Sequence, residues 1–298
     1  MDFRTELGRL VNVEVFEDEL LSRHTSFGIG GPAEFFVRPA TVDDLMAVLR
    51  LCEAHEVPLM VIGRGTNLLV GDGGVRGVVL DLSQACRQLQ ERSDGLVVGS
   101  GVSVSELLEF CVRQGWGGGE FMAGIPGSVG GAVRVNAGAW GESIGQRVRA
   151  IKGYDSGGGE VFLKGKDVRF GYRRAYLPGE PIIVEVELAL TRESPQAVEA
   201  RAREFSQRRS SQPTGQRSAG CVFKNPPEIA AGKLIEDSGC KGLRVGGAEV
   251  SPEHANFIVN RGGATAEDVK RLIQQVRDRV EERFGIELEM EILWVGEE

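Results

Sequence analysis

The stretch from Gly124 to Gly141 reads GIPGSVGGAVRVNAGAWG and holds six glycines, one proline and no acidic side chain. A shorter glycine loop, GRGTNLLV, precedes it at residues 63–70. Glycine has no Cβ, so a ligand can approach its main chain closely and several N–H groups can turn toward one anion. One such loop is typical of a tight turn between strands. Two loops without carboxylates favour a cradle for a large anionic cofactor.

The composition indicates a folded, soluble chain. Its 298 residues are enough for two or three small domains, and 41% of them are hydrophobic, which suffices for packed cores. Glycine is in excess, with 42 residues, but no Gly-X-Y period is present. The net charge of −8 argues against a sequence-blind nucleic-acid binder and against a protein held on anionic lipid.

The N-terminal segment MDFRTELGRL is charged throughout, and no segment approaches 18 uninterrupted apolar residues. We therefore expect neither a signal peptide nor a membrane span, and a cytoplasmic location. The five cysteines lack CxxC spacing and are expected to be free thiols. The three histidines are scattered, so neither a metal cluster nor a histidine-based triad is expected.

Capping residues and apolar spacing predict three amphipathic helices, and a fourth, charged helix could link two halves of the molecule. Short apolar runs predict strands on both sides of the first glycine loop and in an antiparallel unit further on. The class is α+β, and no repeat is evident. The expected helices lie at 41–57, 103–115, 196–209 and 265–285, and the expected strands at 59–62, 77–82, 96–99, 148–154, 159–163, 182–190 and 286–294.

Five motifs in one order give the chain a family resemblance. They are TSFGIGGPA at 25–33, GRGTNLLV at 63–70, GIPGSVGGAV at 124–133, FGYR at 170–173 and SAGCVFKNP at 218–226. Each motif alone is weak, but the ordered set resembles the UDP-N-acetylenolpyruvoylglucosamine reductases, and the resemblance runs from about residue 22 to residue 295. The short run 190–209 leaves no room for a tyrosine-bearing insertion, so the chain resembles the branch without that loop.

The resemblance implies a flavin-binding domain of the vanillyl-alcohol-oxidase (PCMH) type in two α+β subdomains, followed by a C-terminal α+β substrate domain. FAD is expected to bind without a covalent link, and NADPH to serve as reductant. The expected boundaries are an N-terminal extension at 1–20, an FAD-binding domain at 21–193 with subdomains at about 21–83 and 84–193, and a substrate-binding domain at 194–298.

The implied reaction reduces UDP-N-acetylglucosamine enolpyruvate to UDP-N-acetylmuramate in peptidoglycan precursor synthesis. The expected partner is this small-molecule substrate, with no nucleic acid, no membrane and no obligate protein partner. Hydride addition to the terminal carbon of the enolpyruvyl group leaves enolate charge, which must be stabilised and then protonated.

The resemblance assigns three catalytic roles. Arg173 matches the arginine that stabilises the enolate, and a guanidinium suits this role because it grips a carboxylate bidentately and keeps its proton. Cys221 stands where the family usually has the serine that donates the proton; a thiol of ordinary pKa is mostly protonated at neutral pH and can donate. Glu291 matches the catalytic glutamate, which either orients the guanidinium or, if protonated, hydrogen-bonds the enolate.

The remaining site residues fall into two groups by the same resemblance. Substrate diphosphate is expected to meet Lys224 and Asn225, with Arg209 and Lys233 as further candidates. FAD is expected to meet Gly63, Arg64, Gly65, Thr66, Asn67, Leu68, Gly124, Ile125, Pro126, Gly127, Ser128, Gly130, Gly131, Ala132, Asn136, Ala137 and Gly138.

Two alternatives to this reductase stay open at the level of sequence. The same kind of flavin domain serves sugar and alcohol oxidases that use oxygen and often tether flavin through His or Cys, for which His24 is the only nearby candidate. A non-catalytic nucleotide-binding protein is the second alternative, since the change of serine to Cys221 could have ended catalysis. Retention of Arg173, Glu291, Lys224 and Asn225 argues against it.

Overall fold

The computed structural model describes residues 2–209, 212–213 and 215–298. The chain forms two compact units, and each includes segments from different parts of the sequence. Unit 1 consists of Met1–Glu17, Phe35–Arg64 and Gly77–Arg209, and unit 2 consists of Asp18–Glu34, Gly65–Arg76 and Ser210–Glu298.

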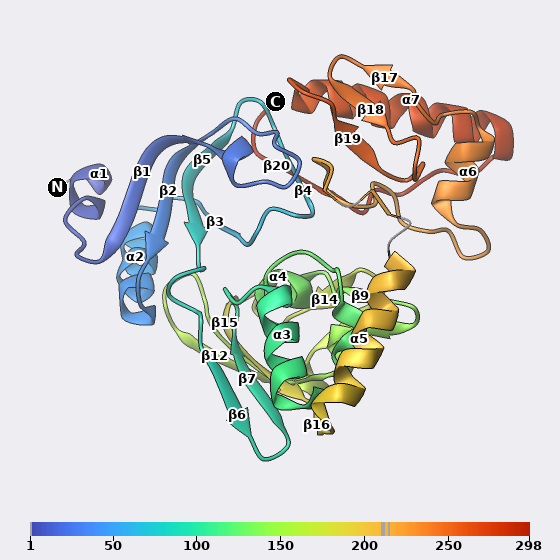
Figure 1. Cartoon of the computed structure of the whole chain (residues 1–298). Helices are drawn as coiled ribbons and strands as arrows, with labels where there is room; N and C mark the ends of the chain where they lie inside the picture. The colour runs from blue at the N-terminus through green and yellow to red at the C-terminus, as the bar shows by residue number, and fades with distance from the viewer. Residues whose placement is uncertain (1, 210–211, 214) are drawn as a thin grey trace. The chain divides into compact units, whose positions relative to one another are not determined.

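Residues 13–81 contain a four-stranded sheet covered by the helix α2 (Val42–Ala54) (Figure 1). Thr41 and Asp44 form a reciprocal capping box that starts this helix, as its sequence predicts. The apolar face of α2 packs on inward-facing strand residues such as Val37 and Leu80. The strand order is β1 (Val13–Leu20), β2 (Pro32–Pro39), β5 (Val75–Asp81) and β3 (Leu59–Ile62).

A five-stranded antiparallel sheet forms the centre of unit 1. Its core includes Val186 and Leu188 together with Leu107 and Cys111 of α3 (Val104–Gln114), whose αL C-cap is Gly115. The strand order is β12 (Glu160–Lys164), β11 (Val148–Tyr154), β15 (Ile182–Ala189), β7 (Gly95–Gly99) and β6 (Leu89–Arg92).

Unit 2 contains a three-stranded sheet and the long helix α7 (Ala266–Phe284), which begins with a capping box and ends at Gly285 in the αL conformation. Val269, Leu272 and Val276 of this helix are buried in the core of the unit. The other elements of this core are β17 (Arg244–Val245), β18 (Ala248–Val250), β19 (Ile258–Asn260), α6 (Ala231–Asp237), and β4 (Leu68–Val70) paired in parallel with β20 (Leu293–Val295).

The remaining elements complete the described part of the chain. They are α1 (Phe3–Leu7), α4 (Val129–Arg134), α5 (Pro195–Arg209), β8 (Trp116–Gly117), β9 (Gly138–Ala139), β10 (Glu142–Ser143), β13 (Arg169–Gly171), β14 (Arg174–Tyr176), β16 (Thr191–Arg192) and the 3₁₀ turns η1 (Leu21–Arg23), η2 (Glu120–Met122), η3 (Ile144–Gln146) and η4 (Gly165–Asp167).

The predicted helices and most predicted strands are confirmed, and two expectations need correction. The stretch 286–294 is a regular strand only from Leu293 onward. Its buried residues are Leu288 and Ile292, four apart, while Met290 between them is 37% exposed, so the alternation in sequence does not become a two-residue burial period. The glycine segment is also not a continuous loop, because α4 forms inside it.

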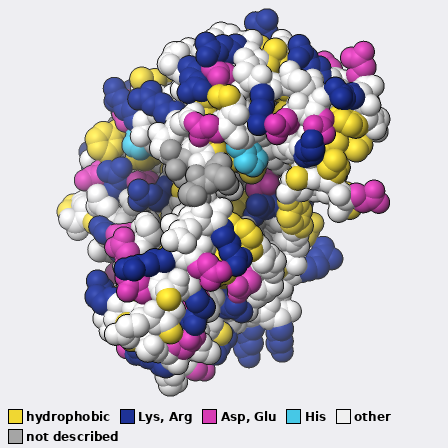
Figure 2. All heavy atoms as spheres, turned by 45° about the vertical axis from the view of Figure 1, so that its right-hand side comes forward, with side chains coloured by type: hydrophobic (Ala, Val, Ile, Leu, Met, Phe, Trp, Pro, Cys, Tyr) yellow, Lys and Arg dark blue, Asp and Glu magenta, His cyan; other side chains and the backbone are white. Residues whose placement is uncertain are grey.

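Acidic and basic side chains are interspersed on the face drawn in Figure 2. Within the described part of the chain, no helix combines the length and apolarity that a membrane crossing requires.

Candidate functional site

The start of the first glycine segment meets the second glycine segment in unit 1, directly after strand β3. Gly63 follows the last residue of β3, and a Cβ built on it would lie 2.6 Å from the Oγ of Ser128. Glycine allows this close approach, since any larger residue would force the hydroxyl of Ser128 to move. Ser128 is the N-cap of α4, and its Oγ accepts a hydrogen bond of 3.3 Å from the N–H of Gly131. Two segments far apart in sequence thus become neighbours.

The main chain of the second glycine segment is partly used by the protein itself. The N–H of Val129 donates to the carbonyl of Val102 at 2.8 Å, and that of Gly130 donates to Ser100 at 2.9 Å. These amides cannot serve a cofactor, which limits the main-chain donors that we expected there. Among the predicted cofactor residues of unit 1, Gly63, Arg64, Gly124, Pro126 and Gly131 are exposed, Ile125, Gly127 and Gly138 are half-buried, and Ser128, Gly130, Ala132, Asn136 and Ala137 are buried.

Arg173 lies at the tip of a tight hairpin in unit 1. Strands β13 and β14 pair through Gly171 and Arg174, which leaves only Tyr172 and Arg173 in the turn. Arg173 has a φ of +56°, in the left-handed region that disfavours residues with a Cβ. Its Nη1 donates a hydrogen bond of 3.1 Å to the carbonyl of Gly138. An arginine thus occupies a position where glycine would be less strained, and such outliers cluster at functional sites.

Arg209 lies against the ends of the glycine segment in unit 1. A Cβ on Gly124 would be 2.7 Å from the Cδ of Arg209. The guanidinium carbon of Arg209 lies 5.2 Å from the centre of the Trp140 ring. The centre of that ring lies 5.6 Å from the centre of the Phe205 ring, and Phe205 is on the same helix as Arg209, α5. The residue that we predicted to bind substrate is therefore beside predicted cofactor residues.

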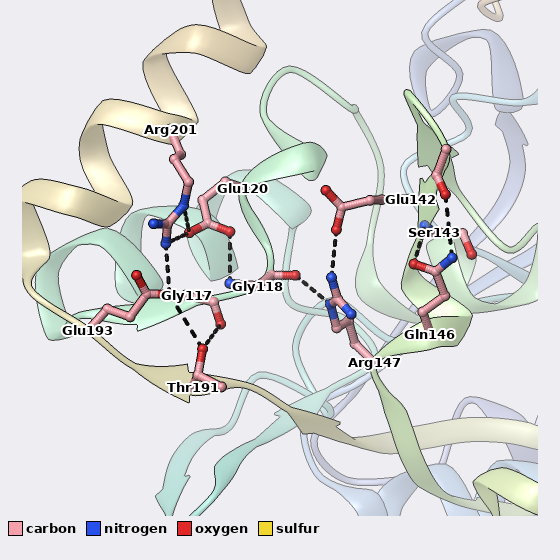
Figure 3. A network of polar contacts seen from close by, with 11 residues as sticks. Gly117, Gly118, Glu120, Glu142, Ser143, Gln146, Arg147, Thr191, Glu193 and Arg201 are labelled. Atoms are coloured by element: carbon pink, nitrogen blue, oxygen red, sulfur yellow. Dashed lines mark hydrogen bonds and ion pairs between the residues drawn. The ribbon is translucent and has the colours of Figure 1, made fainter.

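An ion pair to a buried carboxylate fixes α5 beside the start of the glycine segment (Figure 3). The side chain of Glu120 is 6% exposed; its Oε1 accepts from Nε and Nη2 of Arg201 at 3.0 and 2.5 Å, and its Oε2 accepts from the N–H of Gly118 at 2.7 Å. Arg201 also pairs with Glu193 at 2.8 Å, and Arg147 donates to the carbonyl of Gly118 at 2.7 Å. Sequence reasoning missed this network, because nothing in the pattern shows that Glu120 is buried.

In unit 2, the first glycine loop is joined to the segment that carries Glu291. Nδ2 of Asn67 donates to the main-chain carbonyl of Glu291 at 3.2 Å, and the N–H of Leu293 donates to the carbonyl of Asn67 at 3.0 Å. Gly65, with a φ of +58°, packs so closely that a Cβ would lie 2.3 Å from the carbonyl oxygen of His24. Thr66 and Leu68 are half-buried beside these residues.

The segment that carries Cys221 lies in the same unit and is held from two sides. Cys221 forms an isolated bridge with Phe257, and Phe223 forms one with Met290. Asn256, 3% exposed, accepts from the N–H of Phe223 at 2.9 Å and donates to its carbonyl at 2.8 Å through the same amide side chain. Sequence reasoning missed Asn256, since no motif distinguishes a buried asparagine that clamps a backbone.

The pairing of these segments places two predicted catalytic residues, far apart in sequence, on neighbouring strands of backbone. The N–H of Glu291 donates to the carbonyl of Val222 at 2.8 Å, and the N–H of Lys224 donates to that of Glu289 at 2.8 Å. Cys221 and Glu291 therefore belong to unit 2, on adjacent paired segments, whereas Arg173 belongs to unit 1.

In unit 2, the two lysines and the asparagine that we predicted to bind the substrate have partners within the protein. Lys224 forms an ion pair with Glu289, whose side chain is 74% exposed. The amide oxygen of Asn225 accepts a hydrogen bond of 3.0 Å from the N–H of Ala231 at the start of α6. A ligand would therefore be bound by the NH₂ group of Asn225. Lys233 pairs with Asp237 one turn along α6 at 2.5 Å and is 60% exposed.

Cys221 differs from the other four cysteines in burial. All five are free thiols, but only Cys221 is partly exposed. Burial raises the pKa of Cys52 and Cys86 to about 11 and that of Cys111 to about 12, and it also raises the pKa of Cys240. Those thiols are protonated and enclosed at neutral pH. Among the described residues, no group of three His, Cys, Asp or Glu side chains is arranged to hold a metal ion.

Comparison with known proteins gives a consistent family match. A family model described as an FAD binding domain matches residues 33–162, and one described as the C-terminal domain of UDP-N-acetylenolpyruvoylglucosamine reductase matches residues 212–295. The UDP-N-acetylenolpyruvoylglucosamine reductase of Heliobacterium modesticaldum is 45% identical over 98% of this chain and 94% of its own length. That of Desulfosudis oleivorans is 42% identical over 99% of both chains.

The fold agrees with these matches. The crystal structure of a UDP-N-acetylenolpyruvylglucosamine reductase from Thermus caldophilus superposes with a TM-score of 0.82 at 37% identity, covering 95% of this chain and 99% of that chain. The expected α+β class is confirmed, with a PCMH-type FAD-binding fold and the family's C-terminal domain.

Proposed function

The chain belongs to the UDP-N-acetylenolpyruvoylglucosamine reductase family, and we propose that it catalyses the NADPH-dependent, FAD-mediated reduction of UDP-N-acetylglucosamine enolpyruvate to UDP-N-acetylmuramate in peptidoglycan precursor synthesis. The observation that carries the residue assignment is the pairing of Val222 with Glu291 in unit 2, because it aligns the segments of the proposed proton donor and the proposed glutamate. We propose a cytoplasmic enzyme that needs no protein partner.

The residues of the glycine segments fit an anionic dinucleotide such as FAD. Gly63 and Ser128 bring the two segments together, Arg64 is exposed beside them, and neither segment contains a carboxylate. A Cβ on the exposed Gly131 would meet only the Oγ of Ser128, at 3.3 Å, so a ligand can approach the main chain there. We propose that the exposed glycines and Arg64 hold the diphosphate, with the remaining predicted residues shaping the loop.

When bound and reduced by NADPH, FAD supplies the hydride that the enolpyruvyl group receives. The protein must then stabilise negative charge that develops beside the substrate carboxylate. In the proposed mechanism the guanidinium of Arg173 does this, since it stays charged and can donate two parallel hydrogen bonds. Its hydrogen bond to Gly138 and the restricted turn fix it before substrate binds, which is the form of electrostatic preorganisation that lowers a barrier most.

Proton transfer completes the proposed reaction. The Sγ–H of Cys221 gives its proton to the enolate carbon next to the carboxylate, and solvent restores the thiol. Cys221 is partly exposed, unlike the four buried cysteines, so it is the thiol that a substrate can reach. While the enolate exists, before this proton transfer, Glu291 orients the guanidinium or, when protonated, donates a hydrogen bond to the enolate.

Substrate binding is proposed for the C-terminal part. Lys224 would exchange its exposed partner Glu289 for the substrate diphosphate, which costs little because ion pairs at the surface contribute about 0–1 kcal/mol. The proposed FAD-binding domain spans residues 21–193 and the proposed substrate-binding domain spans 194–298, after an extension at 1–20. Helix α5, at the start of the second span, is packed on α3 within unit 1.

An anaerobic visible spectrum of the FAD-loaded protein tests the proposal. NADPH is expected to bleach the oxidised-flavin bands, and the enolpyruvyl sugar nucleotide is expected to restore them without oxygen. A protein that cannot be loaded with FAD contradicts the flavin assignment. Bleaching that only oxygen reverses, with simple sugars as reductants, would favour an oxidase instead.

A further inference from the structure

The side chain of Asn136 ties its own segment of unit 1 to two others, the 3₁₀ turn η3 and the end of strand β13. Its Nδ2 donates a hydrogen bond of 2.8 Å to the carbonyl of Gly171, and its Oδ1 accepts one of 3.0 Å from the N–H of Gly145. Asn136 is 9% exposed and has a φ of +45°, a conformation that asparagine tolerates better than most residues. Both ends of the amide are therefore engaged by the protein, although the family resemblance placed this residue beside FAD.

The carbonyl that Asn136 holds belongs to the last residue before the turn of Arg173. Gly171 and Arg174 form the final pair of the hairpin, with Tyr172 and Arg173 between them. Two residues after Asn136, the carbonyl of Gly138 accepts from Nη1 of Arg173. One short segment thus holds the backbone at the base of the turn and the guanidinium at its tip.

A strained turn needs such anchors. The left-handed conformation of Arg173 costs about 1–2 kcal/mol relative to a relaxed backbone. The turn would lower its free energy by rotating its peptide groups, unless hydrogen bonds fix their carbonyls. The hydrogen bond from Asn136 fixes the carbonyl of Gly171. We propose that Asn136 is a positioning residue that holds Arg173 in the conformation required to stabilise the enolate. This inference rests on the proposed catalytic role of Arg173.

The variant Asn136→Asp removes the donor and, when ionised, adds a negative charge at the same place. Aspartate keeps the size, the tolerance for positive φ and the acceptor for Gly145, but an ionised carboxylate cannot donate to Gly171. A protonated carboxyl can donate again, so the defect should reverse as the pH falls. Asn12→Asp is the matched control, because Asn12 also has a positive φ, of +60°, but is exposed on the surface of the same unit.

The experiment follows the two half-reactions of the FAD-loaded enzyme by anaerobic stopped flow. In Asn136→Asp, flavin reoxidation by the enolpyruvyl substrate should slow by at least about 10-fold at pH 8, since misplacing a catalytic group by about 1 Å can cost about 10²-fold in rate. Flavin reduction by NADPH should stay within about 2-fold of the wild type, and reoxidation should recover at lower pH. Asn12→Asp should behave as the wild type in both.

Amide hydrogen exchange of the peptide 169–176 gives a readout independent of turnover. It should be faster in Asn136→Asp than in the wild type or Asn12→Asp, because the hairpin has lost its anchor. An unchanged hairpin with unchanged reoxidation overturns the inference. Equal slowing of both half-reactions, or loss of FAD, also overturns it, because it points to a role toward the cofactor or the whole fold.

A double variant separates this inference from the proposed function. If Asn136 acts through Arg173, adding Asn136→Asp to Arg173→Ala should slow reoxidation no further, and a further loss overturns the inference. Wild-type reoxidation in Arg173→Ala alone would contradict the proposed role of Arg173. Slow reoxidation in Arg173→Ala with normal reoxidation in Asn136→Asp would leave that role intact and reject only the positioning by Asn136.

Discussion

The main-chain N–H of Glu291 donates a hydrogen bond of 2.8 Å to the carbonyl of Val222, the residue that follows Cys221. The bond belongs to the backbone and does not depend on the side chains of either proposed catalytic residue. Variants at Cys221 or Glu291 therefore leave the pairing of the two segments in place. Changes in activity at these positions should be separable from changes in folding.

We expect Cys221→Ala to lower turnover by at least about 10²-fold, the usual range for loss of a positioned general acid. Cys221→Ser should retain much more activity, because a hydroxyl occupies the same place and can also donate a proton. The measurement is kcat with NADPH and the enolpyruvyl substrate, with FAD content and the unfolding temperature as controls. Normal turnover of Cys221→Ala with FAD bound would remove this thiol from the mechanism.

Arg173→Gly should separate stability from activity at the hairpin turn. Glycine removes the strain of a φ of +56°, which costs about 1–2 kcal/mol, but also the hydrogen bond to Gly138, which contributes about 0.5–1.5 kcal/mol. Because the two changes oppose each other, stability should stay within about 1 kcal/mol of the wild type. Arg173→Ala keeps the strain and loses the bond, and should be the less stable of the two. Urea unfolding gives the stabilities, and flavin reoxidation by substrate should be slow in both.

An Arg173→Ala protein as stable as Arg173→Gly would mean that the turn relaxes in solution. The comparison needs no assumption about catalysis, so it tests the geometry of the turn by itself.

Much of the fold was predictable because its signals are local. The capping pair Thr41 and Asp44 marks the start of α2 in sequence and in structure, and Gly115 and Gly285 mark the ends of α3 and α7. The alternation across 182–190 became β15, because that strand lies at the centre of a sheet with paired neighbours on both sides. The stretch 286–294 has the same alternation but lacks such neighbours for most of its length.

The site was less predictable because its contacts join distant residues. Asn136 and Asn67 were predicted to lie along FAD, yet the amide of the first holds the backbone beside Arg173 and that of the second holds the carbonyl of Glu291. The amide of Asn256 likewise holds the backbone N–H and carbonyl of Phe223, two residues after Cys221. The sequence identifies which residues match a motif, but only the folded chain shows which hydrogen bonds their side chains have already made.

The network in Figure 3 predicts that losing Arg201 costs more stability than losing its second partner, Glu193. Arg201→Ala should destabilise the protein by about 3 kcal/mol, because it leaves the buried carboxylate of Glu120 with only the N–H of Gly118. Glu193→Ala should cost less than about 1 kcal/mol, since the pair that it breaks is partly exposed and Arg201 keeps its contact with Glu120. Urea unfolding of the full chain measures both, and equal costs would show that Glu120 does not depend on Arg201.

Glu249 predicts a pH dependence of stability in unit 2. Its carboxylate is 5% exposed and accepts from Nε and Nη2 of Arg261 at 3.0 and 3.3 Å; these hydrogen bonds, with the charges of Arg261 and Arg244, lower its pKa. A lowered folded-state pKa adds stability that is fully present above the pKa in the unfolded chain, about 4.3, and is lost as the pH falls through the folded-state value. Glu249→Gln, which cannot ionise, should therefore be less stable than the wild type at pH 7, and the difference should shrink progressively below about pH 4.3. Unfolding midpoints in urea at pH 7, 5, 4 and 3 measure this difference, and a gap that stays constant across the series would mean that the two arginines do not stabilise the charged form of Glu249.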